Sequence, residues 1–264
     1  MLAGLKNHPA VWEMRRLPLW QNLRYDEAAR HSMKRETDFY RQLLEGLPRG
    51  AVLDVGANSG SKTEIFRSMS DFVVAIEPTP RLVHALKNRF QYCRNIKILD
   101  CAVSSTNGTS LLHVFEGDDS YNTLAPEWAS ALRVPHTNRF GLALTSPEKI
   151  RVQTRTLAEL VQEYGPIKYV KIDAEGYEYE IVSSLETPVP LISLEFNLPE
   201  FAGALNRSIE KLHSLSGLYR FNAAVTEPPM KLELSNWVPA EEMREHVNQS
   251  GWHYAELFAR LAPA

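Results

Sequence analysis

The sequence predicts an α/β protein built on a doubly wound, mostly parallel β-sheet. Short apolar runs rich in Val and Ile alternate with helical patterns from about residue 50 onward. Most of these runs are apolar on both faces, as expected for parallel strands that helices cover on both sides. The connections are short, which is typical of repeated β-α-β units. A chain of 264 residues, of which 44% are hydrophobic, can bury an ordinary core of this kind.

The strands and helices of this sheet follow in chain order. Strands are expected at 51–55, 72–76, 96–99, 169–172 and 191–196. The helical patterns between or after them are "SKTEIFRSMS", "TPRLVHALKNRF", "TLAELVQEYG" and "GYEYEIVSSL". Pro80 occupies a position that the first turn of a helix tolerates. Thr156 and Glu159 can form a capping box, and Gly165 stands where that helix should end.

The C-terminal part of the chain breaks the alternation. Residues 218–225, "LYRFNAAV", and 230–238, "MKLELSNWV", have the composition of two further strands. Glu227, Pro228 and Pro229 lie between them, and a turn there would leave no room for a crossover helix. We therefore expect an antiparallel hairpin at this end of the sheet.

Two regions lie outside the regular pattern. Residues 1–46 carry several aromatic side chains among many charges, which predicts an N-terminal helical cap over the sheet or its ligand cleft. Residues 117–149 form a long irregular segment, and such segments in compact domains are usually lids or binding loops. A tolerated surface insertion is the alternative. The predicted organisation is thus a cap at 1–46 and one domain at 47–264 that contains the 117–149 insertion.

Composition argues against several classes of protein. The net charge is −3 and no long basic run occurs, so no electrostatic footprint for nucleic acid or an acidic membrane is present. Cys93 and Cys101 are the only cysteines, too few for a disulfide framework or a zinc site. No run of 18 apolar residues occurs, and the first residues lack the apolar segment of a signal peptide. We expect a soluble, cytoplasmic protein with no nucleic-acid or membrane partner.

The turn after the first strand, "VLDVGANSG", has the residues of a ligand-binding loop. In doubly wound folds, ligands bind at the carboxyl ends of the strands, and glycine lets the backbone approach them closely. The loop differs from the dinucleotide fingerprint G-x-G-x-x-G because the third glycine is missing. It also differs from a Walker loop, since no glycine stands five residues before Gly60.

Two further strand ends complete the pattern. Glu77 ends the second strand, 17 residues after Gly60, where a carboxylate can accept hydrogen bonds from both hydroxyls of a ribose. The third strand runs into "LDCAV", with Asp100 and Cys101 placed to contact an adenine. D-x-G-x-N-x-G followed by these acids is the arrangement used for S-adenosylmethionine. Asp54 would then face the ammonium group of its methionine part.

Four segments resemble the FkbM-type S-adenosylmethionine-dependent methyltransferases. They are "VLDVGANSG", "AIEPTP", "VQTRTLAELV" and, as the most specific, "VKIDAEGYEYEIVSSL", and together they cover roughly residues 47–197. The resemblance implies a class I methyltransferase fold, Rossmann-like, with seven strands of which the last is antiparallel. It implies that 47–264 is the methyltransferase domain and that the reaction is O-methylation of a sugar or natural product. The predicted cofactor-binding residues are Asp54, Gly56, Ala57, Asn58, Gly60, Glu77, Pro78, Asp100, Cys101, Ala102 and Asp173.

The candidate catalytic residues are acids at two strand ends. Methyl transfer to an alcohol requires in-line positioning and a group that takes the hydroxyl proton. "KIDAEG" places Asp173 and Glu175 at one strand end, and "SLEFN" places Glu195 and Asn197 at the next. We predict Glu195 as the general base and Asp173 as the holder of cofactor and acceptor geometry. In the alternative, Asp173 only holds the methionine ammonium and Glu175 orders the following turn.

Other readings of the same residues stay open. Carboxylate and amide oxygens at these strand ends also suit a divalent cation, but no third carboxylate stands at a defined spacing, so no metal is predicted. An NAD-dependent oxidoreductase would share the fold but should carry G-x-G-x-x-G. A non-catalytic adenosine-ligand-binding protein would keep the cofactor residues without turnover. The expected partner is a small-molecule acceptor whose identity the sequence does not specify.

Overall fold

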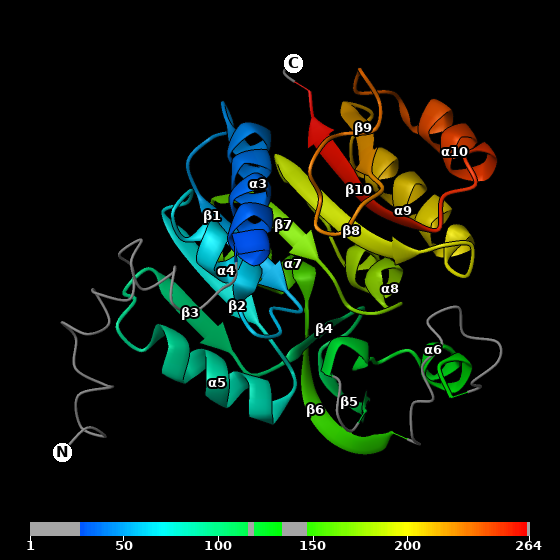
Figure 1. Ribbon diagram of the computed structural model, residues 1–264. Helices are drawn as coiled ribbons and strands as arrows, with labels where there is room; N and C mark the ends of the chain where they lie inside the picture. The colour runs from blue at the N-terminus through cyan, green and yellow to red at the C-terminus, as the bar shows by residue number, and fades with distance from the viewer. Residues whose placement is uncertain (1–26, 116–118, 134–146, 263–264) are drawn as a thin grey trace, which may run out of the picture.

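The computed structural model describes residues 27–115, 119–133 and 147–262. Its main sheet has seven strands in the order β3-β2-β1-β7-β8-β10-β9 (Figure 1). The strands are β1 (Ala51–Val55), β2 (Phe72–Ile76), β3 (Ile96–Leu99), β7 (Ile167–Ile172), β8 (Leu191–Asn197), β9 (Tyr219–Ala224) and β10 (Tyr254–Leu261). Only β10 runs antiparallel to its neighbours, β8 and β9. The predicted class I methyltransferase fold, doubly wound with antiparallel C-terminal strands, is confirmed.

The second strand of the C-terminal pair lies later in the chain than predicted. Residues 230–238 form no regular strand. Instead, helix α10 (Ala240–Gln249) separates β9 from its antiparallel partner β10. The side chain of Asn222 donates to the carbonyls of Leu234 and Asn236 and accepts from the Leu234 N–H. Because these backbone groups are bonded to a side chain, they are not available to a β-ladder.

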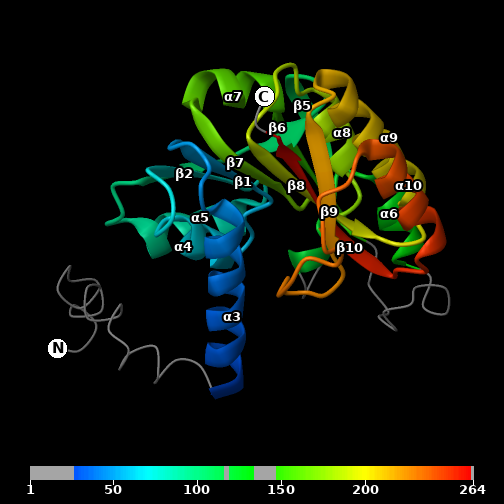
Figure 2. The ribbon, with the colours of Figure 1, turned by 90° about the horizontal axis from the view of Figure 1, so that it is seen from above.

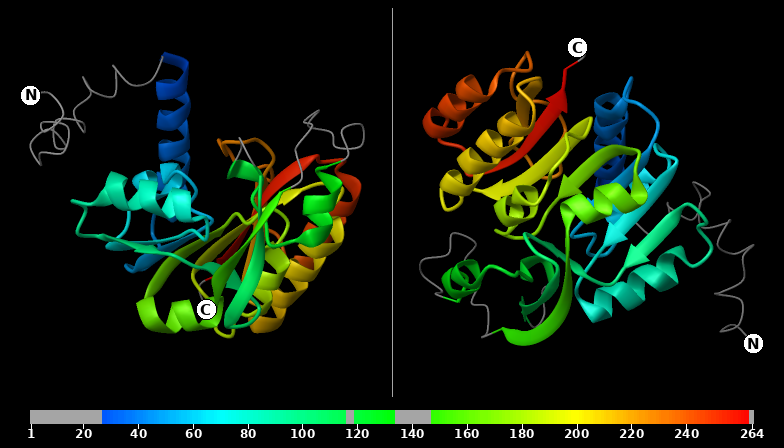
Figure 3. Two further views of the ribbon diagram at one scale, coloured as in Figure 1. Left: turned by 90° about the horizontal axis from the view of Figure 1, so that it is seen from below. Right: turned by 180° about the vertical axis from the view of Figure 1, so that it is seen from behind.

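Helices cover both faces of the main sheet. Alternate residues of β1 show this, since Leu53 packs with α7 (Leu157–Tyr164), α8 (Glu178–Ser183), α9 (Ala202–Leu215) and α10. Val52 points to the other face, where it packs with α3 (Glu27–Leu44) and α4 (Ser61–Phe66). Helix α5 (Pro80–Phe90) joins this second group through Ala75 of β2. Figures 2 and 3 show the two groups of helices on opposite sides of the strands.

Helix α3 is the described part of the predicted N-terminal cap. Its C-terminal turns bury Phe39, Tyr40, Leu43 and Leu44 against the sheet, and the rest of the helix extends away from the domain (Figure 2). The first 26 residues of the predicted cap lie outside the described residues, so its division from the main domain stays a prediction. No helix in the described ranges is both long and apolar enough to cross a bilayer.

A second, smaller sheet lies beside the main one (Figure 1). Its strands are β4 (Ala102–Ser104), β5 (Gly108–Val114) and β6 (Glu148–Thr156), in the order β4-β6-β5. Between β5 and β6 come the short helix η2 (Asp119–Tyr121) and helix α6 (Pro126–Ala131). These two helices are part of the predicted insertion at 117–149. Residues 117–118 and 134–146 of that insertion lie outside the described residues.

Candidate functional site

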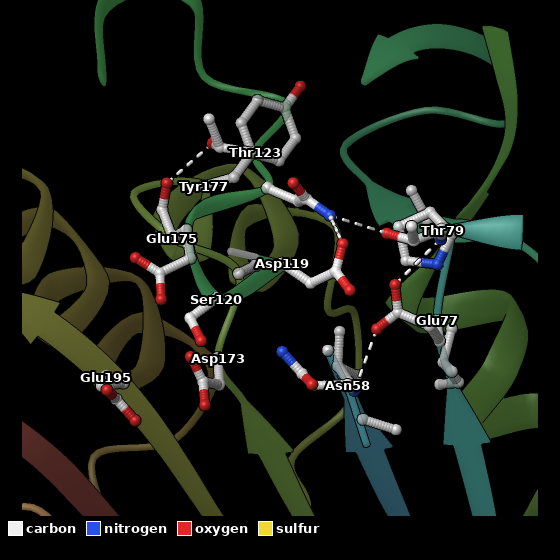
Figure 4. A pocket seen from close by; sticks show the side chains of 18 of the residues that line it. Asn58, Glu77, Thr79, Asp119, Ser120, Thr123, Asp173, Glu175, Tyr177 and Glu195 are labelled. Carbon is white, nitrogen blue, oxygen red and sulfur yellow. Dashed lines mark hydrogen bonds between the residues drawn. The ribbon is translucent and has the colours of Figure 1, made fainter. Parts of the chain in front are cut away.

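A pocket of about 500 Å³ opens at the carboxyl ends of β1, β2, β7 and β8 (Figure 4). Most of the predicted site residues line it, although they come from five separate strand ends, those of β1, β2, β3, β7 and β8. The predicted residues in its wall are Gly56, Ala57, Asn58, Glu77, Pro78, Cys101, Ala102, Asp173 and Glu195. Asp54, Gly60 and Asp100 are not in the wall. The structure therefore brings nine of the twelve predicted residues together around one cavity.

The glycines of the loop after β1 are required by packing of the chain on itself. Gly56 has a φ of 78°, and a Cβ there would lie 1.8 Å from the backbone oxygen of Asp173. Gly60 has a φ of 82°, and a Cβ there would lie 2.7 Å from the side chains of Leu86 and Phe90. Only glycine fits both the positive φ and these close approaches. The loop can thus pass against β7 and α5 while Ala57 and Asn58 face the pocket.

Asp54 lies behind this loop, on the face of the sheet that carries α3 and α4. Its carboxylate is buried and accepts a hydrogen bond of 2.5 Å from the hydroxyl of Thr63 on α4. Burial raises its pKa, while the ammonium of Lys171 and the Thr63 bond act in the opposite direction. Asp54 therefore helps to fix the helix that follows the loop, and its predicted contact with a methionine ammonium is not tested by this geometry.

Glu77 is the fixed carboxylate of the pocket. One oxygen, Oε2, accepts from the backbone N–H of Asn58 at 2.9 Å, and Oε1 accepts from that of Thr79 at 2.8 Å. Only 4% of the residue is exposed, and burial raises its pKa although the hydrogen bonds oppose this. A carboxylate oxygen has two lone pairs, so each can accept another hydrogen bond from a ligand. Glu77 thus presents two oriented acceptors to the pocket.

The segment after β5 bridges the two ends of the pocket. Residues 119–124 all line it. Asn122 donates through Nδ2 to Oγ1 of Thr79 at 3.2 Å, beside Glu77, and Asp119 pairs with Arg81 of α5. Thr123 donates from its hydroxyl to the backbone oxygen of Glu175 at 2.7 Å, at the opposite end. This described part of the predicted lid is therefore anchored on both sides of the cavity (Figure 4).

The end of the pocket opposite Glu77 is acidic. Figure 4 shows Asp173, Glu175 and Glu195 together on that side, and Glu227 and Tyr254 also line the pocket. Burial raises the pKa of Glu175 and of Glu195, and the charge of Asp173 raises both further. Carboxyl groups with raised pKa values in a cleft are candidates for proton transfer.

The loop that carries Asp173 and Glu175 is held by a buried carboxylate behind it. Glu178 accepts from the backbone N–H groups of Ala174 at 2.9 Å and Gly176 at 3.2 Å. Burial raises the pKa of Glu178 to about 7, against the hydrogen bonds. Glu178 thus orders the turn, the role that the sequence alternative assigned to Glu175, while Glu175 faces the pocket.

A row of polar side chains crosses the main sheet below the acidic end, and the sequence reasoning did not single it out. In the strand register Asp54 lies beside Lys171, Lys171 beside Ser193, and Glu195 beside Glu256. A lysine at an inner position of the apolar run "YVKI" was the available signal. It was weak because only the pairing of strands shows what surrounds that lysine.

Tyr254 of β10 also escaped the sequence reasoning. Its hydroxyl is buried and has no hydrogen-bond partner among the described residues, yet the residue lines the pocket. Burial raises the pKa of this phenol, so it stays protonated and can donate. Buried polar atoms in native proteins are nearly always paired, so an unpaired one in a pocket wall indicates a ligand contact.

The described residues give little support to a metal site or to a reactive thiol. They contain no group of three or more His, Cys, Asp or Glu side chains arranged to hold a metal ion. Burial raises the pKa of Cys101 in the pocket wall to about 11, so it is a thiol at neutral pH and a weak nucleophile. The oxygen donors of the acidic end and of Glu77 therefore dominate the chemistry of the pocket.

Comparison with known proteins places these features in a family. A family model of the methyltransferase FkbM domain matches residues 54–215, which include the loop after β1, Glu77 and the strand-end acids. The methyltransferase sdnD of Sordaria araneosa is 26% identical over 159 residues. That stretch is 51% of this chain and 60% of the relative, so the chain spans less than two thirds of the relative's length.

Solved structures of methyltransferases also align with this one. The precorrin-6y C5,15-methyltransferase of Geobacter metallireducens aligns with a TM-score of 0.42 and 11% identity over 86% of this chain and 87% of its own. A TehB-like methyltransferase of Corynebacterium glutamicum gives 0.41 and 12%, over 96% of this chain and all of its own. At this level of similarity neither structure indicates what the present chain acts on.

Proposed function

This chain belongs to the FkbM methyltransferase domain family, and from that membership we propose that it transfers a methyl group from S-adenosylmethionine to a hydroxyl of a sugar or natural-product molecule. The observation that supports the proposal best is the division of the pocket into two ends. One end offers the fixed acceptors of Glu77, and the other gathers acids with raised pKa values. A methyltransferase that acts on alcohols needs a subsite for the cofactor and, beside it, a group that accepts the proton of the hydroxyl.

The residues of the first end fit S-adenosylmethionine. The two oxygens of Glu77 suit the two hydroxyls of its ribose. Ala57 and Asn58, at the close approach permitted by Gly56, would contact its methionine part, and Cys101 with Ala102 would lie against the adenine. Bound there, S-adenosylmethionine supplies an electrophilic methyl group on a sulfonium centre.

The residues of the acidic end carry out the part of the reaction that the protein contributes. Glu195 takes the proton of the acceptor hydroxyl as general base, and its raised pKa makes it a stronger base than an exposed carboxylate. Asp173, which follows the strand next to the loop, orients the groups that react. The 119–124 segment lies over both ends and keeps water out of the pocket.

The proposed lid and cap extend this closure. The roles of residues 117–149 as a lid and of the N-terminal 46 residues as a cap stay predictions, and two features of their described parts support them. Residues 119–124 line the pocket. Lys62, which lines the pocket, pairs with Glu36 of α3. Limited proteolysis should show protection within 117–149 when cofactor and acceptor bind together. Unchanged cleavage there would leave the segment a surface insertion.

Calorimetry tests the proposed function before an acceptor is known. We expect S-adenosylhomocysteine to bind with a dissociation constant in the micromolar range, about −8 kcal/mol. NAD titrated under the same conditions should give no heat of binding, and binding of NAD alone would favour an oxidoreductase. A panel of sugars and hydroxylated natural products is then incubated with S-adenosylmethionine, and the formation of S-adenosylhomocysteine is measured. Binding without turnover across a broad panel would favour a non-catalytic binding protein.

A further inference from the structure

Lys171 is a buried lysine at the acidic end of the pocket, below its wall. Its side chain is 1% exposed, and its Nζ lies 2.8 Å from Oδ2 of Asp173 and 3.8 Å from Oε2 of Glu195. These carboxylates come from the ends of the two neighbouring strands β7 and β8. Burial alone would lower the pKa of Lys171, but the surrounding carboxylates raise it well above its ordinary value, so the ammonium keeps its charge.

The charges that face Glu195 come from every element packed around it. Asp173 follows β7, Glu227 lies in the connection between β9 and α10, and Glu256 is its neighbour on β10. Tyr254, also on β10, is the other titratable group beside it and is neutral. Among the described residues, Lys171 provides the one cation within 4.0 Å of the Glu195 carboxylate. Asp173, Glu227 and Glu256, by contrast, are carboxyl groups, and their negative charges raise the pKa of Glu195.

A further buried carboxylate, Glu256 of β10, also raises the pKa of Lys171 and is itself fixed by hydrogen bonds. Glu256 accepts a hydrogen bond of 2.7 Å from Ser193. The hydroxyl of Tyr40 on α3 lies 3.4 Å from both oxygens of the same carboxylate. The Lys171 side chain, enclosed in this way, has a restricted position, so its distance from Asp173 and Glu195 is set by the packing of β7, β8, β10 and α3.

We propose that Lys171 is a positioning residue for methyl transfer: its ammonium holds Asp173 by direct contact and keeps Glu195 in the carboxylate form that accepts a proton. This assignment rests on the proposed function, because Lys171 acts only through Asp173 and Glu195. In the step that it serves, the O–H bond of the acceptor breaks and its proton passes to Glu195. The oxygen forms a bond to the methyl carbon, and the electrons of the carbon–sulfur bond remain on sulfur.

The structural alternative is an ion pair that only stabilises the fold. Removing one partner of a buried ion pair is strongly destabilising whatever its role in catalysis, so a loss of stability alone does not separate the two explanations. The two explanations differ in one measurable quantity. An opposite charge within about 4–6 Å lowers the pKa of a carboxyl group by roughly one to three pH units. Loss of the ammonium should therefore raise the titration midpoint of Glu195, whereas a purely structural lysine would leave it in place.

Carbon-13 NMR of the full chain measures that midpoint directly. The protein is labelled at the glutamate side-chain carboxyl carbon, and each resonance is followed from about pH 4 to pH 10. Glu195→Gln identifies the Glu195 resonance by its disappearance. In Lys171→Met the Glu195 midpoint should rise by about one to three pH units. Lys171→Arg, which keeps the charge, should return it most of the way towards the wild-type value.

Lys168→Met is the matched control. Lys168 lies on the same strand, three residues earlier, and donates from Nζ to the backbone oxygen of Met69 at 3.1 Å, away from the pocket. It should leave the Glu195 midpoint unchanged. If the midpoint is also unchanged in a folded Lys171→Met protein, Lys171 is a structural residue and the proposal is wrong.

A second pair of variants covers the case in which Lys171→Met does not fold. Asp173→Asn and Asp173→Asn/Lys171→Met differ only in the lysine, and the double variant leaves no unpaired partner at the 2.8 Å contact. The Glu195 midpoint should still be higher in the double variant. Titration needs neither cofactor nor acceptor, so it is read independently of S-adenosylhomocysteine binding, on which the proposed function depends. With an acceptor in hand, the acid limb of the single-turnover pH profile should move with the midpoint, and an unmoved limb would overturn the catalytic role.

Discussion

The two ends of the pocket each hold a glutamate, Glu77 buried and Glu195 partly buried, and the surroundings of these glutamates differ. The carboxylate of Glu77 accepts backbone hydrogen bonds on both oxygens, at 2.9 and 2.8 Å. That of Glu195 receives no hydrogen bond from the described residues, and its nearest cation lies at 3.8 Å. Backbone N–H groups on both oxygens fix a carboxylate and act to stabilise its charged form, while a sparsely bonded one can gain and lose a proton. The difference indicates binding at one end and proton transfer at the other.

The largest expected effect comes from removing the proton acceptor. General base catalysis typically contributes about 10²–10⁴-fold, so Glu195→Gln should lower the single-turnover rate of methyl transfer by roughly that factor. The amide keeps the shape of the side chain and removes only its charge. The affinity for S-adenosylhomocysteine, measured by calorimetry, should therefore stay close to that of the wild type.

Two other variants serve as comparisons for Glu195→Gln. Glu186→Gln, at an exposed glutamate, should leave both the rate and the affinity unchanged. Asp173→Asn should weaken cofactor binding and turnover together, since Asp173 belongs to the acidic end but also lies beside the loop after β1, where its backbone N–H donates to the Val55 carbonyl. Wild-type turnover in Glu195→Gln would place the base elsewhere in the acidic end and would erase the contrast with Glu77.

The next effect is expected at the opposite end of the pocket. Hydrogen bonds to charged groups contribute on the order of 1.5–3 kcal/mol, so Glu77→Ala should weaken S-adenosylhomocysteine binding by roughly 10–150-fold. Once the cofactor is saturating, the rate of the methyl-transfer step should recover. Calorimetry gives the affinity, and single-turnover assays at rising S-adenosylmethionine concentration give the rate. Unchanged affinity in this mutant would refute the ribose assignment.

The parts of the fold that sequence predicted are those with local signals. The strands of the central sheet are apolar on both faces, and two of the helices carry a start signal, Pro80 for α5 and the Thr156 cap for α7. Strand β10 was missed because Glu256 and Arg260 interrupt its apolar pattern at a spacing that also suits a helix surface. Strand β6 is short of apolar residues because most of its positions are exposed or half-buried. Whether a charged residue is buried depends on partners that are distant in the sequence, and a local pattern does not contain them.

The same distinction applies to the site. Glu77, Asp173 and Glu195 could be predicted because each follows an apolar run, and parallel strands bring their carboxyl ends to one edge. Tyr254 enters the pocket from an antiparallel strand, so its position at the strand start gave no such signal. Gly60 has a packing role that the local pattern could not show, while its contact with the cofactor stays a prediction. Its missing side chain makes room for α5, which only the packed structure shows.

A variant of Glu178 tests whether a hydrogen-bonded carboxylate behind the acidic end behaves like Glu77 at the other end. Glu178 accepts two backbone N–H groups, as Glu77 does, but burial raises its pKa to about 7 from an ordinary 4.5. The folded chain then binds more protons than the unfolded chain between these values. Its stabilising contribution is full below about pH 4.5 and is lost as the pH rises through 7.

Glu178→Gln should remove this loss of stability with rising pH. The amide oxygen can still accept both hydrogen bonds, so between pH 5 and pH 8 the free energy of unfolding should fall by about 2 kcal/mol less than in the wild type. Urea denaturation at the two pH values provides the measurement. Glu180→Gln, on the same helix, is the control and should follow the wild type. Parallel pH dependence of Glu178→Gln and wild type would show that Glu178 is ionised in the fold, like a surface carboxylate.

The smallest effect concerns a hydroxyl at the acidic end. Tyr254 has a buried Oη with no partner among the described residues, whereas Oη of Tyr219 donates to the Val189 carbonyl at 2.8 Å and accepts from its N–H at 2.9 Å. A single hydrogen bond is worth about 0.5–1.5 kcal/mol. If Tyr254 donates to the acceptor, Tyr254→Phe should slow turnover roughly 2–10-fold without weakening S-adenosylhomocysteine binding or lowering stability, because no protein bond is lost.

Tyr219→Phe should do the reverse, lowering the free energy of unfolding by about 1–3 kcal/mol with the rate unchanged. Thermal or urea unfolding and single-turnover assays on both proteins separate the two tyrosines. Loss of stability in Tyr254→Phe would mean that its hydroxyl has a partner within the protein, and the acidic end would then lack this donor for an acceptor.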